Sequence, residues 1–167
     1  VFVYTFTLNA QSIKISEITQ TESGLSLSFF TNAAEFITES DGKLIFNYSL
    51  GIEEDSPGKP MLPGRNFIIA IPPYSKVSFD ILNKQEKIFQ KIEIKVSPEI
   101  SFTSDSTILY KETNVSSKYL ENDIYPSKEI EILGYTWVRE FYCAVIRINP
   151  YQYQWKSKSV SVIESAQ

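Results

Sequence analysis

The sequence contains no histidine, and it has a single cysteine and a single methionine among its 167 residues. Without an imidazole to accept the nucleophile's proton, neither a Ser-His-Asp triad nor a Cys-His dyad can form within this chain. One thiol and no imidazole also cannot supply the three or four ligands of a usual zinc site. The lone cysteine has no partner for an internal disulfide. Carboxylate chemistry, an oxygen-ligand cation site or a protein that binds without catalysing remain, and we favour the last.

Alanine is scarce as well, with 6 residues against 21 isoleucines, 11 phenylalanines and 10 tyrosines. Branched and aromatic side chains suit a pleated, half-buried surface, whereas a chain poor in alanine forms helices reluctantly. A hydrophobic fraction of 43% with 22% charged residues is ordinary for a folded globule. A chain of this length forms one domain that buries roughly 70% of the surface it exposes when unfolded. We therefore expect one all-β domain that folds without a metal or cofactor.

Basic residues are not in excess, since 16 Lys and Arg stand against 20 Asp and Glu. The net charge of -4 and a pI near 5.0 oppose a nucleic-acid partner, whose phosphates require a basic face. No apolar run approaches the roughly 20 residues that cross a bilayer as a helix. We expect neither a nucleic-acid partner nor a membrane span.

The first eight residues form an apolar run that ends at Asn9-Ala10-Gln11-Ser12. A hydrophobic stretch followed by a small residue is typical of the end of a secretory signal peptide. This pattern predicts that residues 1–10 are the tail of such a signal and that residues 11–167 are the exported domain. A first β-strand with alternating Val1, Val3, Thr5 and Thr7 is the competing interpretation. Because the chain starts with valine, and its end has no feature of a natural terminus, we expect a longer precursor.

Segments in which apolar and polar residues alternate recur between turn signals, as in an antiparallel sandwich or barrel. The first of them places Leu25, Leu27 and Phe29 on one face and serines on the other. The Asp41-Gly42 dipeptide predicts a tight turn before the second. Residues 149–154 are predicted to form a corner before the last strand. Strands are predicted at residues 24–30, 43–50, 67–71, 76–82, 87–96, 137–148 and 158–163.

Residues 101–123 lose this periodicity, and Ser, Thr, Asp, Asn, Lys and Glu predominate there. The composition predicts a long polar loop. Loops of this length in compact domains are usually functional or mobile.

Two stretches carry a recognisable order of motifs. The first is Gly58-Lys-Pro-Met-Leu-Pro63, followed by Phe67-Ile-Ile-Ala-Ile-Pro72. The second stretch contains Tyr125-Pro126, Gly134-Tyr135, Arg139, Ala144-Val-Ile-Arg-Ile-Asn-Pro150, Gln152-Tyr153 and the strand around Val160 and Val162. Taken in this order, the two stretches resemble the N-terminal propeptide of the gingipain-type cysteine peptidases, over roughly residues 40–163.

The resemblance implies a β-sandwich of jelly-roll type with no catalytic residue of its own. It implies that the domain keeps a downstream cysteine peptidase latent in cis and assists its folding. A surface loop of the propeptide would place a basic residue in the specificity pocket of the peptidase. Residues 101–123 are the candidate loop, and Lys111 and Lys118 are its basic side chains, with Lys128 a weaker third. The alternative is that these lysines are simply solvated, as exposed lysines usually are.

The motif residues themselves have structural interpretations. Prolines on both sides of residues 67–71 prevent that strand from continuing and set the chain direction. Gly58 and Gly64 are expected to supply unusual backbone dihedral angles. Pro150 ends the strand that contains Cys143, and Tyr153 is expected to lay its ring over the sandwich edge. The structural set comprises Gly58, Pro60, Leu62, Pro63, Pro72, Arg139, Pro150, Gln152 and Tyr153.

Three further candidates are weighed against simpler roles. Cys143 is expected to be a buried packing thiol rather than a nucleophile, because no basic cluster surrounds it in the sequence. Glu53, Glu54 and Asp55 lack the spaced pattern of a calcium loop and are interpreted as a solvated acidic turn. Trp137, Trp155, Tyr151 and Tyr153 are interpreted as packing residues, although they could form a sugar-stacking platform. A stand-alone adhesive or carbohydrate-binding sandwich is therefore the alternative function.

Overall fold

The computed structural model describes residues 3–4, 13–20, 24–31, 36–38, 44–46 and 57–167. Nearly all regular structure in these residues is β-strand, as the scarcity of alanine predicts. The elements are β1 (Val3–Tyr4), β2 (Ile13–Gln20), β3 (Leu25–Thr31), β4 (Phe36–Thr38), β5 (Leu44–Phe46), β6 (Arg65–Ala70), β7 (Gln85–Phe89), β8 (Glu99–Phe102), β9 (Ile108–Lys111), α1 (Ser117–Leu120), β10 (Ile124–Tyr125), β11 (Ile130–Val138), β12 (Phe141–Ile148), β13 (Tyr151–Gln154) and β14 (Ser159–Ala166).

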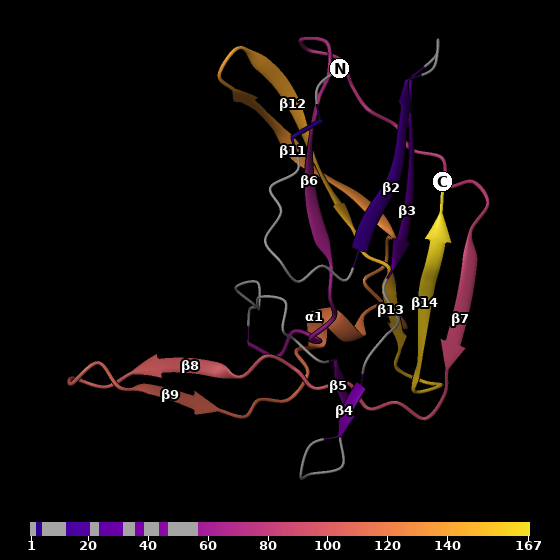
Figure 1. Ribbon diagram of the computed structural model, residues 1–167. Coiled ribbons are helices and arrows are strands. Elements are labelled where there is room, and N and C mark those ends of the chain that lie inside the picture. The colour runs from indigo at the N-terminus through magenta and orange to yellow at the C-terminus, as the bar shows by residue number, and fades with distance from the viewer. Residues whose placement is uncertain (1–2, 5–12, 21–23, 32–35, 39–43, 47–56) are drawn as a thin grey trace.

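Two main sheets form the body of the domain (Figure 1). One has the strand order β1-β6-β12-β11, and the other has the order β10-β13-β14-β3-β2, with β7 also paired to β14. All of these pairs are antiparallel. The predicted all-β, antiparallel architecture is confirmed, and the jelly-roll topology stays a prediction.

The main core lies between the two sheets, because its buried side chains come from both. Phe67 and Ile69 of β6 and Ile146 of β12 meet Phe29 of β3 and Ile163 of β14. These side chains lie at alternate positions of their strands, which is the period-2 pattern expected of a sheet with one buried face. Burial of such side chains stabilises the fold by about 1.5–3 kcal/mol each.

A second core lies at the other end of the sheet that contains β14. Tyr151 and Tyr153 of β13 pack there with Val160 of β14 and with Ile92 and Ile94. The Tyr153 hydroxyl donates a hydrogen bond of 2.9 Å to the Ile92 carbonyl, which satisfies a buried polar group. The expectation that Tyr153 covers the sandwich edge is wrong, because its ring is only 3% exposed. The strand pairing turns this side chain inward.

Replacing Tyr151 by phenylalanine should flatten the alkaline loss of stability. Burial raises the pKa of the Tyr151 hydroxyl from 10.0 to about 12, so tyrosinate forms more easily in the unfolded chain. Below pH 10 the Tyr151 hydroxyl is protonated in both states, and its contribution to stability is complete. As the pH rises from 10 through 12, the unfolded chain loses this proton first, so the free energy of unfolding falls. The difference in free energy of unfolding between wild type and Tyr151→Phe, measured by urea unfolding, should change by about 2–3 kcal/mol between pH 10 and pH 12.

The matched control for this measurement is Tyr74→Phe, because the Tyr74 side chain is 82% exposed. The Tyr74 variant should follow the wild-type pH dependence. If the free energy of unfolding fell equally steeply with alkaline pH in wild type and Tyr151→Phe, the raised pKa would not belong to Tyr151.

The predicted strand 137–148 is wrong, since two strands and a turn occupy this part of the chain. Strands β11 and β12 pair from Ile130↔Ile148 to Val138↔Phe141, and the turn between them is formed by Arg139 and Glu140. Arg139 has a φ of 54°. Glycine or asparagine usually marks such a position, so arginine there gives no turn signal.

Residues 76–82 alternate as predicted but form no strand. Val77, Phe79 and Ile81 still pack against the main core. The segment lies between Tyr74 and Asn83, which both have positive φ values. Its backbone amides bond elsewhere: that of Val77 donates to the Tyr135 hydroxyl, and that of Leu82 to the Gln167 carbonyl. Alternation thus identified the buried face correctly but not a sheet partner.

Two other boundaries differ from the predictions. The predicted strand 87–96 is interrupted after β7, where Lys91 has a φ of 60°. The predicted corner 149–154 contains strand β13, which pairs with β14 and β10. Pro150 lies between β12 and β13, where its missing N–H is harmless, so its predicted role in ending β12 is confirmed.

At the start of the chain, Val3 and Tyr4 pair with Ile69 and Ile68 of β6. This pairing is the local structure that the first-strand interpretation expects, and the signal peptide stays a prediction. The Asp41-Gly42 turn and the Glu53, Glu54 and Asp55 cluster lie outside the described residues. Among the residues that the structure describes, no helix is long and apolar enough to span a membrane.

Candidate functional site: a projecting hairpin and its base

Strands β8 and β9 form a two-stranded sheet of their own, which projects from the body of the domain (Figure 1). The prediction of an irregular loop over residues 101–123 is therefore wrong, because a hairpin and the short helix α1 occupy most of it. The polar residues that suggested a loop are concentrated in the tip, Thr103-Ser-Asp-Ser-Thr107. We refer to residues 99–111 as the hairpin.

One face of the hairpin is entirely apolar. Cross-strand pairing joins Ile100 to Tyr110 and Phe102 to Ile108, which places these four side chains on the same face. The exposed fractions are 52% for Ile100, 71% for Phe102, 47% for Ile108 and 67% for Tyr110. An isolated hairpin is marginally stable in water, and clustered apolar side chains on a surface mark interaction sites. This face is therefore suited to contact with another protein surface.

The hairpin tip is closed by a defined turn. The Ser106 amide donates to the Thr103 carbonyl, and the Thr103 amide donates to the Thr107 carbonyl, each at 3.0 Å. Ser106 has a φ of 65°, the left-handed position of a type I turn followed by a bulge. The tip thus has a fixed shape set by its own short polar side chains and backbone.

Gly58 attaches the base of the hairpin to the body. Its amide donates to the Ser97 carbonyl at 2.8 Å, and its carbonyl accepts from the Ser116 amide at 3.1 Å. Its φ is +76°, and a Cβ atom there would lie 2.7 Å from the Asn114 carbonyl oxygen. The predicted unusual dihedral angle is confirmed, and the close approach gives a second reason for glycine.

Further contacts hold the chain on both sides of the hairpin. The Gln152 side chain donates to the Pro126 carbonyl at 3.0 Å. The Trp155 indole N–H donates to the Tyr119 carbonyl at 3.1 Å. Pro60 is fully buried and bridges to Val96, just before the hairpin. These contacts together form a platform that fixes both ends of the hairpin region to the body.

The remaining motif residues also have structural positions. Leu62 packs against the second core, and Pro63 and Pro72 lie outside the two ends of β6. The dihedral role expected of Gly64 is wrong, because no positive φ is found there. A Cβ atom on Gly64 would instead lie 2.6 Å from a terminal nitrogen of Arg147. Glycine leaves room for that guanidinium against the backbone.

Neither of the two predicted lysines lies at the hairpin tip. Lys111 ends β9 opposite Glu99, and their charged groups are 3.5 Å apart at the base of the hairpin. Lys118 is on α1, where its Nζ lies 4.6 Å from the centre of the Tyr119 ring. Lys128 is exposed in the chain that follows β10.

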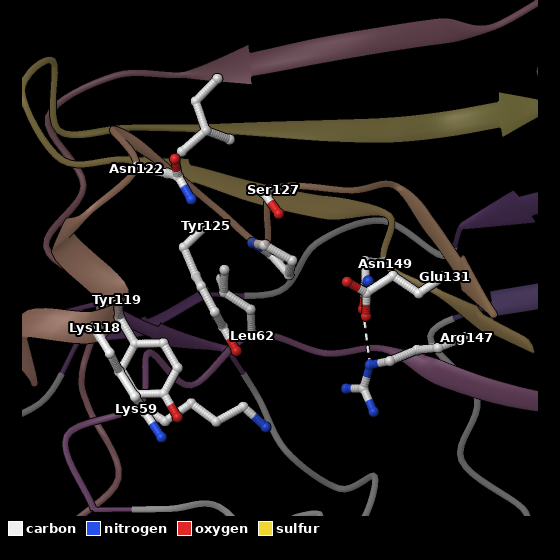
Figure 2. A pocket seen from close by; sticks show the side chains of 12 residues that line it. Lys59, Leu62, Lys118, Tyr119, Asn122, Tyr125, Ser127, Glu131, Arg147 and Asn149 are labelled. Carbon is white, nitrogen blue, oxygen red and sulfur yellow. Dashed lines mark hydrogen bonds between the residues drawn. The ribbon is translucent and has the colours of Figure 1, made fainter. Parts of the chain in front are cut away.

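Lys118 also lines a cavity of about 310 Å³ beside the hairpin base. Figure 2 shows Lys59 and Lys118 at one side of this cavity and Arg147 at the other. The Arg147 Nε donates to the Asn149 side-chain oxygen at 2.8 Å, and Asn149 is 1% exposed. The cavity therefore belongs to the platform rather than to the projecting part of the hairpin.

The sugar-stacking platform is not assembled. Tyr151 and Tyr153 are buried, and Trp155 packs edge-on against Tyr153 with the ring centres 4.8 Å apart. Trp137 lies in a different, exposed cluster with Tyr74 and Tyr142. Cys143 is 3% exposed, which confirms its expected role as a packing thiol. No three acidic or cysteine side chains gather for a metal ion in the part of the chain that the structure describes.

A family model described as Propeptide_C25 matches residues 39–166, most of the chain. The chain belongs to the Propeptide_C25 family. This assignment confirms the resemblance drawn from the Gly58–Pro63 and Gln152–Tyr153 motifs. The chain is accordingly a non-catalytic propeptide.

Two solved structures share the fold of this propeptide. A complex of the Porphyromonas gingivalis RgpB pro- and mature domains contains a chain that is 16% identical, with a TM-score of 0.71, covering 93% of this propeptide and 82% of that chain. A structure addressing the zymogenic latency of gingipain K from the same organism is 13% identical, with a TM-score of 0.55. The match covers 99% of this propeptide and 97% of that chain. A search of curated proteins finds no match.

The apolar face of the hairpin and its tip were missed by the sequence reasoning. Ile100 and Phe102 on one side, and Ile108 and Tyr110 on the other, are symmetric about the polar tip. That symmetry is the signal that could have identified the hairpin of the propeptide. It was hidden because polar residues predominate over residues 101–123, and this composition was interpreted as a loop without periodicity.

Proposed function

We propose that this propeptide keeps a gingipain-like cysteine peptidase latent by inserting its β8–β9 hairpin into the active-site cleft. The partner is the peptidase domain of the same precursor, held in cis, and the propeptide also assists the folding of that domain. Export through an N-terminal signal peptide, of which residues 1–10 are the tail, is part of the same proposal. The apolar run of residues 1–8, followed by the small residue Ala10, supports it.

The observation that carries the proposal is the projecting hairpin with its exposed apolar face. A globular domain has no folding reason to expose Ile100, Phe102, Ile108 and Tyr110 together on a projecting two-stranded sheet. In a Propeptide_C25 chain, a peptidase cleft is the surface that such a hairpin would enter. The platform around Gly58 would hold it in the correct direction.

Tethering makes modest affinity sufficient for latency. An inhibitor joined to its target by a short linker acts at an effective concentration of roughly millimolar. A hairpin that binds with a Kd of about 10 μM in trans would then occupy the cleft about 99% of the time in cis. Removal of the tether would release the peptidase without any conformational switch in the propeptide.

The purified propeptide should inhibit its mature peptidase in trans, and this assay also tests the lysine prediction. If Lys111 or Lys118 is the pseudo-substrate, its replacement by alanine should raise the inhibition constant about 100-fold, because a charged partner is lost from a desolvated pocket. Residual hydrolysis of a peptide substrate is measured against propeptide concentration.

Lys76→Ala serves as the control, since Lys76 is exposed in the chain between β6 and β7, outside the hairpin and α1. Unchanged inhibition by both single lysine variants and by the double variant would reject the lysine assignment alone. A wild-type propeptide that fails to inhibit at micromolar concentration would reject the proposed function.

A further inference from the structure

The hairpin carries only three charged residues, which are Glu99, Asp105 and Lys111. Glu99 and Lys111 face each other at the base, with an ion-pair distance of 3.5 Å. Their charges therefore offset each other where the hairpin joins the body. The remaining charge, that of Asp105, lies at the tip and is the one that the hairpin presents outward.

The tip holds Asp105 in a defined conformation. Its carboxylate accepts hydrogen bonds from the Thr107 amide at 3.3 Å and from the Thr103 hydroxyl. These hydrogen bonds lower the pKa of the Asp105 carboxyl, so the group is ionised at neutral pH. The other tip residues are threonines and serines, which are uncharged. A partner surface that meets the tip thus meets a fixed carboxylate surrounded by small hydroxyl groups.

Strand β8 leads into the tip in an extended conformation. Within the described part of the chain, its partner is β9 alone, so its other edge is available for pairing. Extended segments with an available edge bind by adding a strand, and alternate side chains then enter pockets. Ile100 and Phe102 of β8 would lie along the cleft, and the turn that follows them would present Asp105.

We infer that Asp105 is the side chain that the hairpin presents to the specificity pocket, and that the partner peptidase prefers an acidic residue at that position. This inference rests on the proposed function. It replaces the basic pseudo-substrate with a carboxylate, because the lysines lie at the hairpin base and on α1. The matching pocket would carry arginine or lysine donors, which recognise carboxylates through charge-assisted hydrogen bonds.

The first test uses Asp105→Asn and Asp105→Lys variants of the whole propeptide in the inhibition assay. Asparagine keeps an oxygen that can accept the Thr107 amide, so it removes the charge and preserves the turn. Asp105→Asn should raise the inhibition constant about tenfold or more, and Asp105→Lys should raise it further. Glu99→Gln, which removes the other hairpin carboxylate, should leave inhibition unchanged. Amide NMR shifts of Thr103 and Ser106 check that the tip is intact.

The second test measures the specificity of the mature peptidase with Phe-Thr-Ser-X reporter peptides, where X is Asp, Asn, Lys or Arg. The Asp peptide should have the highest kcat/KM, exceeding the Asn peptide about tenfold or more. A preference for Lys or Arg, or an Asp105→Asn variant that inhibits as well as wild type, would overturn this inference while leaving the proposed function intact. Absence of inhibition by wild type would overturn both.

Discussion

Replacing Ile100, Phe102, Ile108 and Tyr110 together by threonine is expected to weaken inhibition of the partner peptidase by at least about 100-fold. Burying each of these side chains in a cleft contributes about 1.5–3 kcal/mol before the cost of association is deducted. All four are at least 47% exposed in the propeptide alone, so they have this surface left to bury. Threonine is chosen because its β-branched side chain preserves strand propensity. The inhibition constant in trans is the measurement.

The control for the apolar face lies on the opposite side of the same hairpin. Leu109 pairs with Ser101 and is 49% exposed, so Leu109→Thr removes similar apolar area from the other face. Leu109→Thr should inhibit within about threefold of wild type, and neither variant should shift the melting temperature by more than a few degrees. Equal losses from the two faces would mean that the hairpin is contacted from both sides or not through its apolar face.

Replacing Gly58 by alanine is expected to lower the free energy of unfolding by about 2–4 kcal/mol. A positive φ costs an L-residue about 1–2 kcal/mol, and displacing the backbone weakens hydrogen bonds worth about 1 kcal/mol each. The added methyl would lie 2.7 Å from the Asn114 oxygen and 2.8 Å from the Ser116 nitrogen, both backbone atoms. Urea unfolding measures the loss. Hydrogen exchange should show that amides at the hairpin base lose protection first.

Gly24→Ala is the matched control for this substitution. A Cβ atom at Gly24 would meet nothing within 4 Å, and its φ is outside the positive range. This variant should change stability by no more than about 0.5 kcal/mol. If Gly58→Ala were as stable as Gly24→Ala, the close packing of the Gly58 loop against residues 114–116 would not exist in solution.

Alternation in the sequence predicted the buried faces better than it predicted the strands. It located β3 and β14: Leu25, Leu27 and Phe29 pack in or against the main core, and Val160 and Val162 pack in the second core. In residues 76–82 it identified the side chains that pack, although the backbone has no strand partner there. Side-chain burial depends on local pattern, whereas pairing depends on segments distant in the chain, and a single sequence gives no information about these.

Turns made by residues without a turn signal were the main source of error. Arg139 and Lys91 adopt positive φ values with ordinary long side chains, so neither break could be located. Gly58 behaved as its motif suggested. The hairpin was missed for a different reason, since serine, threonine and charged residues predominate over residues 101–123 and were interpreted as a polar loop.

The separation of the hairpin from both main sheets has an evolutionary consequence. Because β8 and β9 pair only with each other among the described strands, substitutions in their side chains do not disturb the packing of the body. Gly58 and its hydrogen bonds help to keep the base of the hairpin in place. On the proposed function, the hairpin can therefore change together with the peptidase it inhibits while the body of the domain stays the same. A chimera that carries the hairpin of another propeptide on this domain should inhibit the peptidase that the other propeptide inhibits.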